Sequence, residues 1–318
     1  MKFYDIFNGD ADGLCALRQL RLVGPRDSIL VTGPKRDIRL LDRVEAGPAD
    51  VLTVLDISMA RNAGGLQRAL ASGATVTWFD HHHPGEVPRH ERLQAHIDTD
   101  PSVCTSLLVD RHLDGRARAW AIVGAFGDNL GTPAQVLASA CGYTGKRTAL
   151  LQRLGRCLNY NAYGDTESDL LFPPHALYER LARYADPEVF ALEDDAFPAL
   201  EEAMTADLDR ALAVRPMMEG IAAAVFELPD DAWSRRVTGT FANHVTRSNP
   251  DRAHAILTPS HGRVTVSIRA PANRPSGADE LARRFEGGGG REAAAGIDHL
   301  APGRVPEFVE AFLAAYTG

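Results

Sequence analysis

The sequence predicts an α/β protein in which a parallel sheet with helices on both faces is followed by a smaller α/β domain. Two observations support this prediction: apolar runs of strand length, and stretches of helical periodicity between them. The strand-like runs occupy residues 3–7, 28–32, 51–55 and 75–79, and the helix-like stretches between them occupy residues 14–22 and 65–71. Continuous apolar strands that alternate with helices are typical of parallel sheets buried on both faces.

The chain of 318 residues is long enough for two domains, and its composition changes along the sequence. We expect a first domain over residues 1–185, whose later part is helical at about 105–127, 134–158 and 174–185. Residues 186–219 are rich in alanine and acidic residues and contain three prolines, which indicates a helical linker. A second domain is expected over residues 220–318, with strands at 221–226, 253–257 and 264–269 and helices at 277–285 and 306–316.

The composition narrows the classes of function. A hydrophobic content of 45% is typical of a globular protein with a sizeable core. A formal net charge of −8 argues against long DNA as a partner, because broad affinity for nucleic acid needs a basic surface. No segment approaches the roughly 18 consecutive apolar residues of a membrane span, and the first residues do not resemble a secretion signal. The four cysteines are scattered without a CxxC pair, so we expect a cytoplasmic protein with reduced thiols.

Acidic residues, two histidines and one asparagine follow three of the predicted strands and one predicted helix. They are Asn8, Asp10, Asp12, Asp56, Asp80, His81, His82 and Asp128. Ligands of parallel α/β sheets bind at the carboxyl ends of the strands, so these side chains are expected to meet although they lie far apart in the chain. Each segment alone has an ordinary explanation, since Asp-x-Asp-Gly is usually a turn and Asp56 can cap a helix. The joint pattern favours a functional site.

Carboxylates combined with a few imidazoles are typical ligands of divalent metals. We expect two ions, most simply Mn²⁺, with Co²⁺ or Mg²⁺ as alternatives, because hard oxygen donors suit these metals. The candidate ligands are Asn8, Asp10, Asp12, Asp56, His81 and Asp128, with Asp56 bridging the two ions. A pair of ions of this kind polarises a phosphoryl oxygen and activates water for attack on phosphorus.

These segments resemble, in order and spacing, the motifs of the DHH phosphoesterases. The matching residues are Asn8–Gly13, Leu55–Asp56, Asp80–His82 and Gly127–Asp128. The segment Gly288–Gly296, together with Ser267–Arg269, resembles the DHH-associated substrate-binding domain. The resemblance covers nearly the whole chain, and it implies a DHH catalytic domain, a linker and a DHH-associated domain.

The resemblance implies two metal positions that share Asp56. The first would include Asp10, and the second would include Asp12, His81 and Asp128. Asn8 stands where members of the family commonly carry histidine or aspartate, and a neutral amide is expected to weaken the first position.

The resemblance also assigns roles near the reacting phosphate. His82 would face the scissile phosphate as a catalytic and substrate-contacting group, and Asp80 would orient the histidines. Arg269, the glycines Gly288, Gly289 and Gly290, and Arg291 would hold the substrate phosphates. Arg291 stands where the family's glycine motif commonly ends in histidine.

The leading hypothesis is therefore a metal-dependent phosphohydrolase that acts between its two domains on short oligonucleotides or small nucleotides. An exopolyphosphatase is the alternative, because an arginine clamp does not need a base to recognise. A nucleotide-binding sensor with weak catalysis is an alternative of another class. A homodimer is plausible from the family, and we expect neither long DNA nor a membrane as a partner.

Overall fold

The computed structural model describes residues 1–317 and divides into two compact units, one comprising Met1–Glu201 and the other beginning at Glu202. The first unit is built around a sheet in which every neighbouring pair of strands is parallel. Its strands are β1 (Phe3–Phe7), β2 (Ile29–Val31), β3 (Val51–Leu55), β4 (Thr75–Asp80) and β5 (Leu93–Ile97), arranged in the order β2-β1-β3-β4-β5. The four predicted strands and their parallel arrangement are confirmed.

The edge strand β5 was not predicted from the sequence. Its residues, Leu-Gln-Ala-His-Ile, are none of them fully buried, so the segment lacks the continuous apolar run that identified the other strands. Its pairing with β4 holds this segment in a strand conformation that its own composition does not predict.

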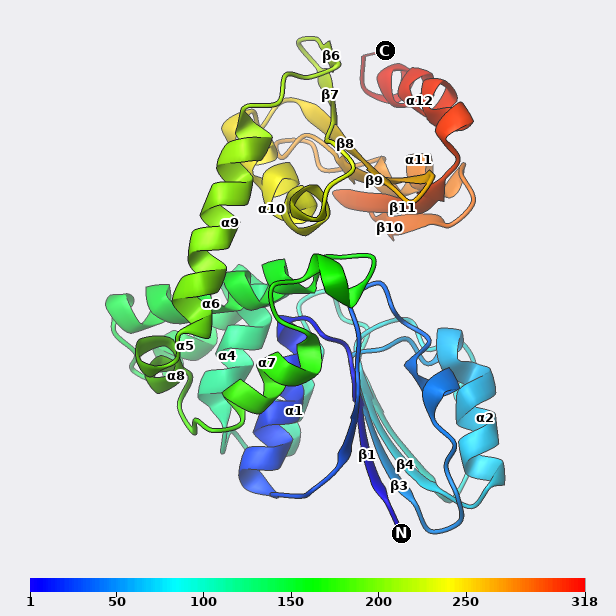
Figure 1. Ribbon diagram of the computed structural model, residues 1–318, viewed down its shortest axis with the longest axis vertical. Coiled ribbons are helices and arrows are strands. Elements are labelled where there is room, and N and C mark those ends of the chain that lie inside the picture. Colours follow the sequence, from blue (N-terminus) through cyan, green and yellow to red (C-terminus); the bar gives the residue numbers. More distant parts are fainter. Residues whose placement is uncertain (318) are drawn as a thin grey trace. The chain divides into compact units, whose positions relative to one another are not determined.

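Helices cover both faces of the first sheet, as predicted (Figure 1). They are α1 (Ala11–Val23), α2 (Ala63–Ala71), α3 (Thr105–His112), α4 (Arg118–Gly127), α5 (Gly131–Ala140), α6 (Gly145–Ala162), α7 (Pro174–Leu181) and α8 (Pro187–Glu193). Helix α2 lies on one face, where Leu66 and Leu70 pack against Val54 and Trp78, and α1, α4 and α7 lie on the other. None of the helices in the described part of the chain is long and apolar enough to cross a membrane.

The predicted linker region is helical. It contains α8 and the whole of α9 (Ala196–Leu212), which continues from the first unit into the second. Pro187 is the first residue of α8 and Pro198 lies in the first turn of α9, where a missing N–H removes no helical hydrogen bond. These two prolines therefore mark helix starts, whereas Pro216 lies between α9 and the next strand.

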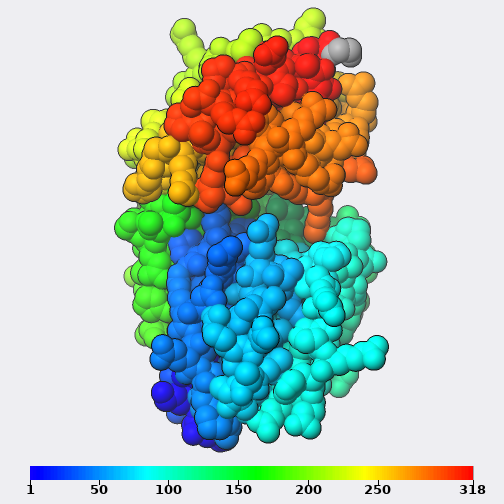
Figure 2. Space-filling view, turned by 90° about the vertical axis from the view of Figure 1, so that its right-hand side faces the viewer, coloured from blue at the N-terminus to red at the C-terminus, as the bar shows by residue number. Residues whose placement is uncertain are grey.

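The second unit contains a mixed six-stranded sheet among its described residues. Its strands are β6 (Met218–Glu219), β7 (Ala223–Glu227), β8 (Ala253–Ser260), β9 (Arg263–Arg269), β10 (Gly288–Arg291) and β11 (Ala294–Leu300), in the order β10-β11-β9-β8-β7-β6. Its helices are α10 (Ala232–Ser248), α11 (Ala278–Arg283) and α12 (Val305–Thr317). Figure 2 shows α12, coloured red, on the surface of this unit.

The two faces of the second sheet are packed differently. Helix α10 covers one face through Val237 and Phe241, which join Ile256 of β8 in one apolar cluster. Helices α11 and α12 cover the other face, where Phe308 and Phe312 meet the alternate residues of β8 and β9. The glycine run forms the edge strand β10, paired with β11, and is not a loop.

His254 of β8 makes the stability of the second unit sensitive to acid. Its side chain is 1% exposed and its Nδ1 atom has no hydrogen-bond partner within residues 1–317. Burial, with a contribution from the charge of Arg252, lowers the pKa of His254 from 6.5 to about 4. As the pH falls below 6.5, the unfolded chain takes up a proton that the folded unit accepts only near pH 4, so stability is lost over this range.

We expect this residue to lower the free energy of unfolding by about 2 kcal/mol between pH 7 and pH 5. Urea denaturation of the wild type and of His254→Gln at both pH values measures the effect, because the variant lacks the titrating ring. His299→Gln, at an exposed position of β11, is the matched control. An identical pH dependence in the wild type and His254→Gln would contradict the assignment.

Candidate metal centre

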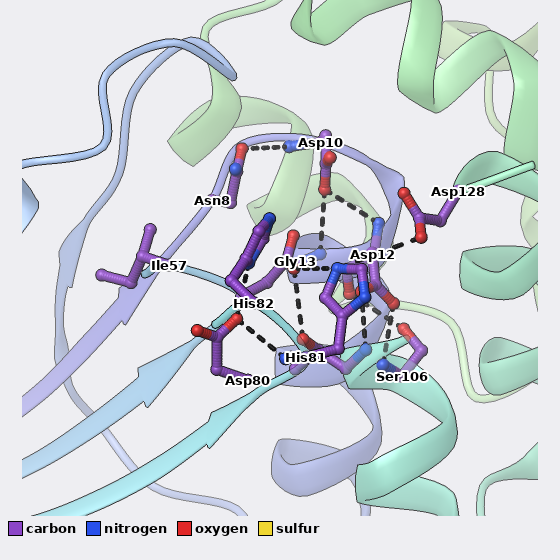
Figure 3. A network of polar contacts seen from close by, with 12 residues as sticks. Asn8, Asp10, Asp12, Gly13, Ile57, Asp80, His81, His82, Ser106 and Asp128 are labelled. Atoms are coloured by element: carbon purple, nitrogen blue, oxygen red, sulfur yellow. Dashed lines mark hydrogen bonds and ion pairs between the residues drawn. The ribbon is translucent and has the colours of Figure 1, made fainter. Parts of the chain in front are cut away.

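The predicted metal ligands come together at the carboxyl ends of the strands in the first unit (Figure 3). Asn8 to Asp12 follow β1, Asp56 follows β3, and His81 follows β4. Asp128 comes from the carboxyl end of α4, directly after Gly127. The parallel topology thus gathers residues separated by more than a hundred positions.

Asp10 forms the N-cap of α1. Its Oδ1 atom accepts hydrogen bonds from the backbone N–H groups of Asp12 and Gly13, at 3.0 and 3.1 Å. A Cβ atom at Gly13 would lie 2.1 Å from the carbonyl oxygen of Asn8, so the turn between β1 and α1 needs glycine there. This tight turn places Asp10 and Asp12 on the same side of the sheet edge.

The carboxylate of Asp12 is held by the first turn of α3. Its Oδ2 atom accepts the backbone N–H of Thr105 and its Oδ1 atom accepts that of Ser106, both at 2.7 Å. The N-terminus of a helix favours negative charge, because its first N–H groups have no partner within the helix. The carboxylate of Asp12 is therefore fixed in orientation.

Asp56 has an unusual backbone conformation. Its φ angle is +58°, in the left-handed region that non-glycine residues seldom adopt, and its side chain is buried. The hydroxyl of Thr105 donates to its Oδ1 atom at 3.1 Å. Such conformations concentrate at functional sites, where the surrounding structure maintains them.

His81 is oriented so that one ring nitrogen faces the carboxylates. Its Nδ1 atom lies 3.0 Å from the carbonyl oxygen of Val103, which accepts the Nδ1–H. The Nε2 atom, left with its lone pair, lies 3.5 Å from Oδ1 of Asp56 and 4.0 Å from Oδ2 of Asp128. A histidine held in this way is typical of a metal ligand.

His82 is paired with the buried side chain of Asp80. Oδ1 of Asp80 accepts the backbone N–H of His81 at 2.9 Å and lies 2.7 Å from Nδ1 of His82. Burial favours the neutral ring of His82, but the hydrogen bond and charge of Asp80 outweigh it, and the pKa of His82 is raised. Asp80 thus contacts both histidines, as the resemblance implied for a residue that orients them.

The ligand atoms lie close enough to share an ion. Two groups stand out among the described residues, namely Asp12, His81 and Asp128, and Asp56, His81 and His82, each with its atoms within 4.8 Å of one another. Carboxylate oxygens with one or two imidazole nitrogens fit Mn²⁺ or Mg²⁺. The second group includes His82, so His82 has the position of a ligand as well as that of a phosphate contact.

Burial and the crowding of carboxylates raise the pKa values of two of them. Burial, followed by the charges of Asp10 and Asp12, raises the pKa of Asp56 well above its ordinary value. Burial is also the main cause that raises the pKa of Asp128 to about 6. A divalent cation bound here would relieve this repulsion, so the donor set fits a metal ion.

Lys35 belongs to this site and was missed by the sequence analysis. Its Nζ atom forms an ion pair with Oδ2 of Asp10 at 2.5 Å. Burial alone would raise the pKa of Asp10, but Lys35 and the backbone hydrogen bonds outweigh it and lower the pKa to about 2. Lys35 follows β2, a fourth strand end, and is one of three lysines in the chain, and these two signals could have identified it.

The predicted substrate-binding residues lie together on the second sheet. In the register of the strands, Ala294 of β11 is opposite both Arg269 of β9 and Arg291 of β10. Opposite residues in a sheet project from the same face, and alternate strands are about 10 Å apart, so the two arginines flank Ala294. Nε of Arg269 donates to Oδ1 of Asn243 at 3.1 Å, which identifies this as the face covered by α10.

Small side chains lie beside the two arginines. On the same face, two residues along each strand from the arginine row, Gly289 is opposite Gly296. Gly296 is in turn opposite Ser267. Gly288 and Gly290 lie on the opposite face of β10 by alternation, and a Cβ at Gly288 would lie 1.9 Å from the carbonyl oxygen of Ala282. Gly289 is therefore the glycine of the run that lies beside the arginines, while Gly288 allows close packing.

No protein-family model and no curated protein matches the chain, whereas solved structures share its fold. The exonuclease RecJ bound to manganese covers 98% of this chain and 89% of its own, with 18% identity and a TM-score of 0.60. The DHH domain of a member of the s1p family of ribosomal proteins covers 98% and 86%, with 13% identity and a TM-score of 0.64. The pGpG-specific phosphodiesterase PggH from Vibrio cholerae covers 98% of both chains, with 15% identity and a TM-score of 0.53. The chain therefore has the fold of the DHH proteins.

Proposed function

We propose that this chain with the DHH fold is a metal-dependent phosphohydrolase that cleaves phosphoester bonds of short oligonucleotides or small nucleotides. One observation carries the proposal: Asp12, Asp56, His81 and Asp128 converge at the strand ends with Nε2 of His81 directed at two of the carboxylates. Sequence-distant acids and an oriented imidazole at this position are the donor set that such hydrolysis requires.

Asp12, Asp56, His81 and Asp128 would hold a divalent cation, for which Mn²⁺ is the first choice and Mg²⁺ or Co²⁺ are alternatives. When bound, such an ion polarises a phosphoryl oxygen and makes water a better nucleophile. The protein supplies the fixed geometry, because Thr105 and Ser106 hold Asp12 while Val103 holds His81.

His82 is suited to a developing negative charge on the phosphate. Its raised pKa favours the imidazolium form, and Asp80 fixes Nδ1 so that Nε2 is the atom presented outward. About half of the side chain is exposed, so a substrate can reach it. In this form the ring can stabilise the phosphate or donate a proton to the leaving oxygen.

The preference for a short substrate rests on charge. The chain carries a net charge of −8, and only Arg269 and Arg291 flank Ala294 on the glycine-bearing face of the second sheet. Two guanidinium groups match one or two phosphates better than a long polyanion. An exopolyphosphatase is the second candidate, because these same groups bind phosphate without a base.

A side-by-side assay separates the candidate substrates. The purified protein, supplied with Mn²⁺, is incubated with a 5′-phosphorylated dinucleotide, 3′-phosphoadenosine 5′-phosphate, and polyphosphate. We expect hydrolysis of a nucleotide substrate and a rate on polyphosphate at least tenfold lower. The reverse order would establish the polyphosphatase, and tight nucleotide binding without turnover of any compound would establish a sensor.

A further inference from the structure

Lys35 lies at the first of the two metal positions that the DHH resemblance implies. That position would be formed by Asp10 and Asp56, with Asn8 at its edge. Nζ of Lys35 is 2.5 Å from Oδ2 of Asp10, and its positive charge also acts on Asp56 and Asp128. A fixed cation therefore already stands where an ion is expected.

The loop around Lys35 positions this side chain. The backbone N–H of Lys35 donates to the carbonyl oxygen of Ala162 at 2.9 Å, which ties the loop after β2 to the end of α6. Nζ lies 5.6 Å from the centre of the Tyr163 ring, a cation–π distance. The side chain is 28% exposed, so it is directed inward rather than into solvent.

One oxygen of Asp10 caps α1 and the other is already paired with a cation. Oδ1 accepts the N–H groups of Asp12 and Gly13, and Oδ2 accepts Lys35. A divalent ion on Oδ2 would lie close to the ammonium group, and two cations on one buried oxygen repel each other strongly.

Asn8 does not offset the repulsion between a divalent ion and Lys35. Its side chain is neutral, and its Oδ1 atom accepts the N–H of Asp10 at 3.3 Å. Asp10 belongs to neither of the two groups of acidic and histidine ligands identified among residues 1–317, both of which contain His81. The first position therefore does not fit a divalent ion, while the position around His81 does.

We infer that Lys35 supplies the positive charge beside Asp10 and that the site holds one divalent ion, at Asp12, Asp56, His81 and Asp128. This inference rests on the proposed function and deepens it. An ammonium group acts as a compact charge with three donors, so Lys35 can hold a phosphate oxygen as well as Asp10. Unlike an ion, it does not activate water, so activation is confined to the His81 side of the site.

Counting bound ions tests the inference without reference to activity. Equilibrium dialysis against Mn²⁺ with elemental analysis gives the number of ions per chain, and electron paramagnetic resonance distinguishes isolated ions from an exchange-coupled pair. The proteins compared are the wild type, the double variant Asn8→Asp/Lys35→Met, and the control Lys146→Met, at an exposed position of α6.

We expect one isolated Mn²⁺ per chain in the wild type and the control, and two coupled ions in the double variant. Two ions in the wild type would overturn this inference and leave the proposed function intact. A folded double variant that still binds one ion would also overturn it, since Lys35 would not be what excludes the second. Binding of no ion by the wild type would overturn the proposed metal site and this inference with it. The number of Mn²⁺ ions bound by the wild type tests the inference even if the double variant fails to fold.

Discussion

Replacing Asp56 with asparagine is expected to abolish hydrolysis and, at the same time, to stabilise the metal-free protein. Asp56 faces Nε2 of His81 and would be a ligand of the ion, so kcat/KM should fall by roughly 10³-fold or more. Metal-free Asp56 is a buried carboxylate beside Asp10 and Asp12, and burial and these charges raise its pKa. Asparagine removes the charge and tolerates the positive φ, so unfolding should require about 0.5–2 kcal/mol more.

Activity assays with Mn²⁺ and thermal denaturation in a chelator measure the two effects. Asp42→Asn, which removes an exposed carboxylate paired with Arg68, is the control. It should change neither kcat/KM nor the stability of the metal-free protein by much. The raised pKa also predicts that the metal-free wild type gains stability as the pH falls through the folded-state pKa of Asp56 toward its ordinary value of 3.8, and that the variant lacks this gain. Activity of Asp56→Asn within about tenfold of the wild type would refute its role as a ligand.

Replacing Arg291 with alanine is expected to raise KM by about 10- to 100-fold with a smaller change in kcat. Arg291 and Arg269 flank Ala294 on the sheet face that also carries Gly289, and each can bind a phosphate through two parallel hydrogen bonds. Arg291 is exposed, whereas Arg269 also bonds to Asn243. Arg269→Ala should therefore affect folding stability as well as KM.

Steady-state kinetics on the best substrate of the side-by-side assay measures this effect. Arg291→Lys keeps the charge but loses the planar fork, so it should recover part of the lost affinity and not all of it. Arg263→Ala, at the exposed start of β9, is the matched control. An unchanged KM in Arg291→Ala, with normal folding, would remove Arg291 from the substrate-binding site.

The sequence predicted the secondary structure best where a segment has an apolar pattern that identifies it without reference to other segments. Each buried strand of the first sheet is a continuous apolar run, so β1, β3 and β4 were predicted at or within a residue of their limits. The partly buried edge strand β5 lacks such a signal and was not predicted. The long helix α10 was also not predicted, although its buried residues recur at helical spacing. The glycine run resembled a loop, and only its pairing with β11 makes it a strand.

The convergence of the candidate ligands could be predicted from the sequence because parallel strands end at one edge of their sheet. That rule brings Asp10, Asp56 and His81 together without knowledge of any side-chain contact. The orientation of these side chains could not be predicted in this way. The carbonyl of Val103 that orients His81, and the N–H groups of Thr105 and Ser106 that hold Asp12, are backbone atoms from a distant loop and helix.

The sequence alone determined the α/β architecture and the residue types that gather at the strand ends, because apolar periodicity and the residues that follow each strand are local properties. Only the tertiary structure decided which charges meet. It places Lys35 on Asp10, gives Asp56 its left-handed conformation, and aligns Arg269 and Arg291 across β11. These relations depend on packing between segments far apart in the chain, and packing has no signature in any single segment.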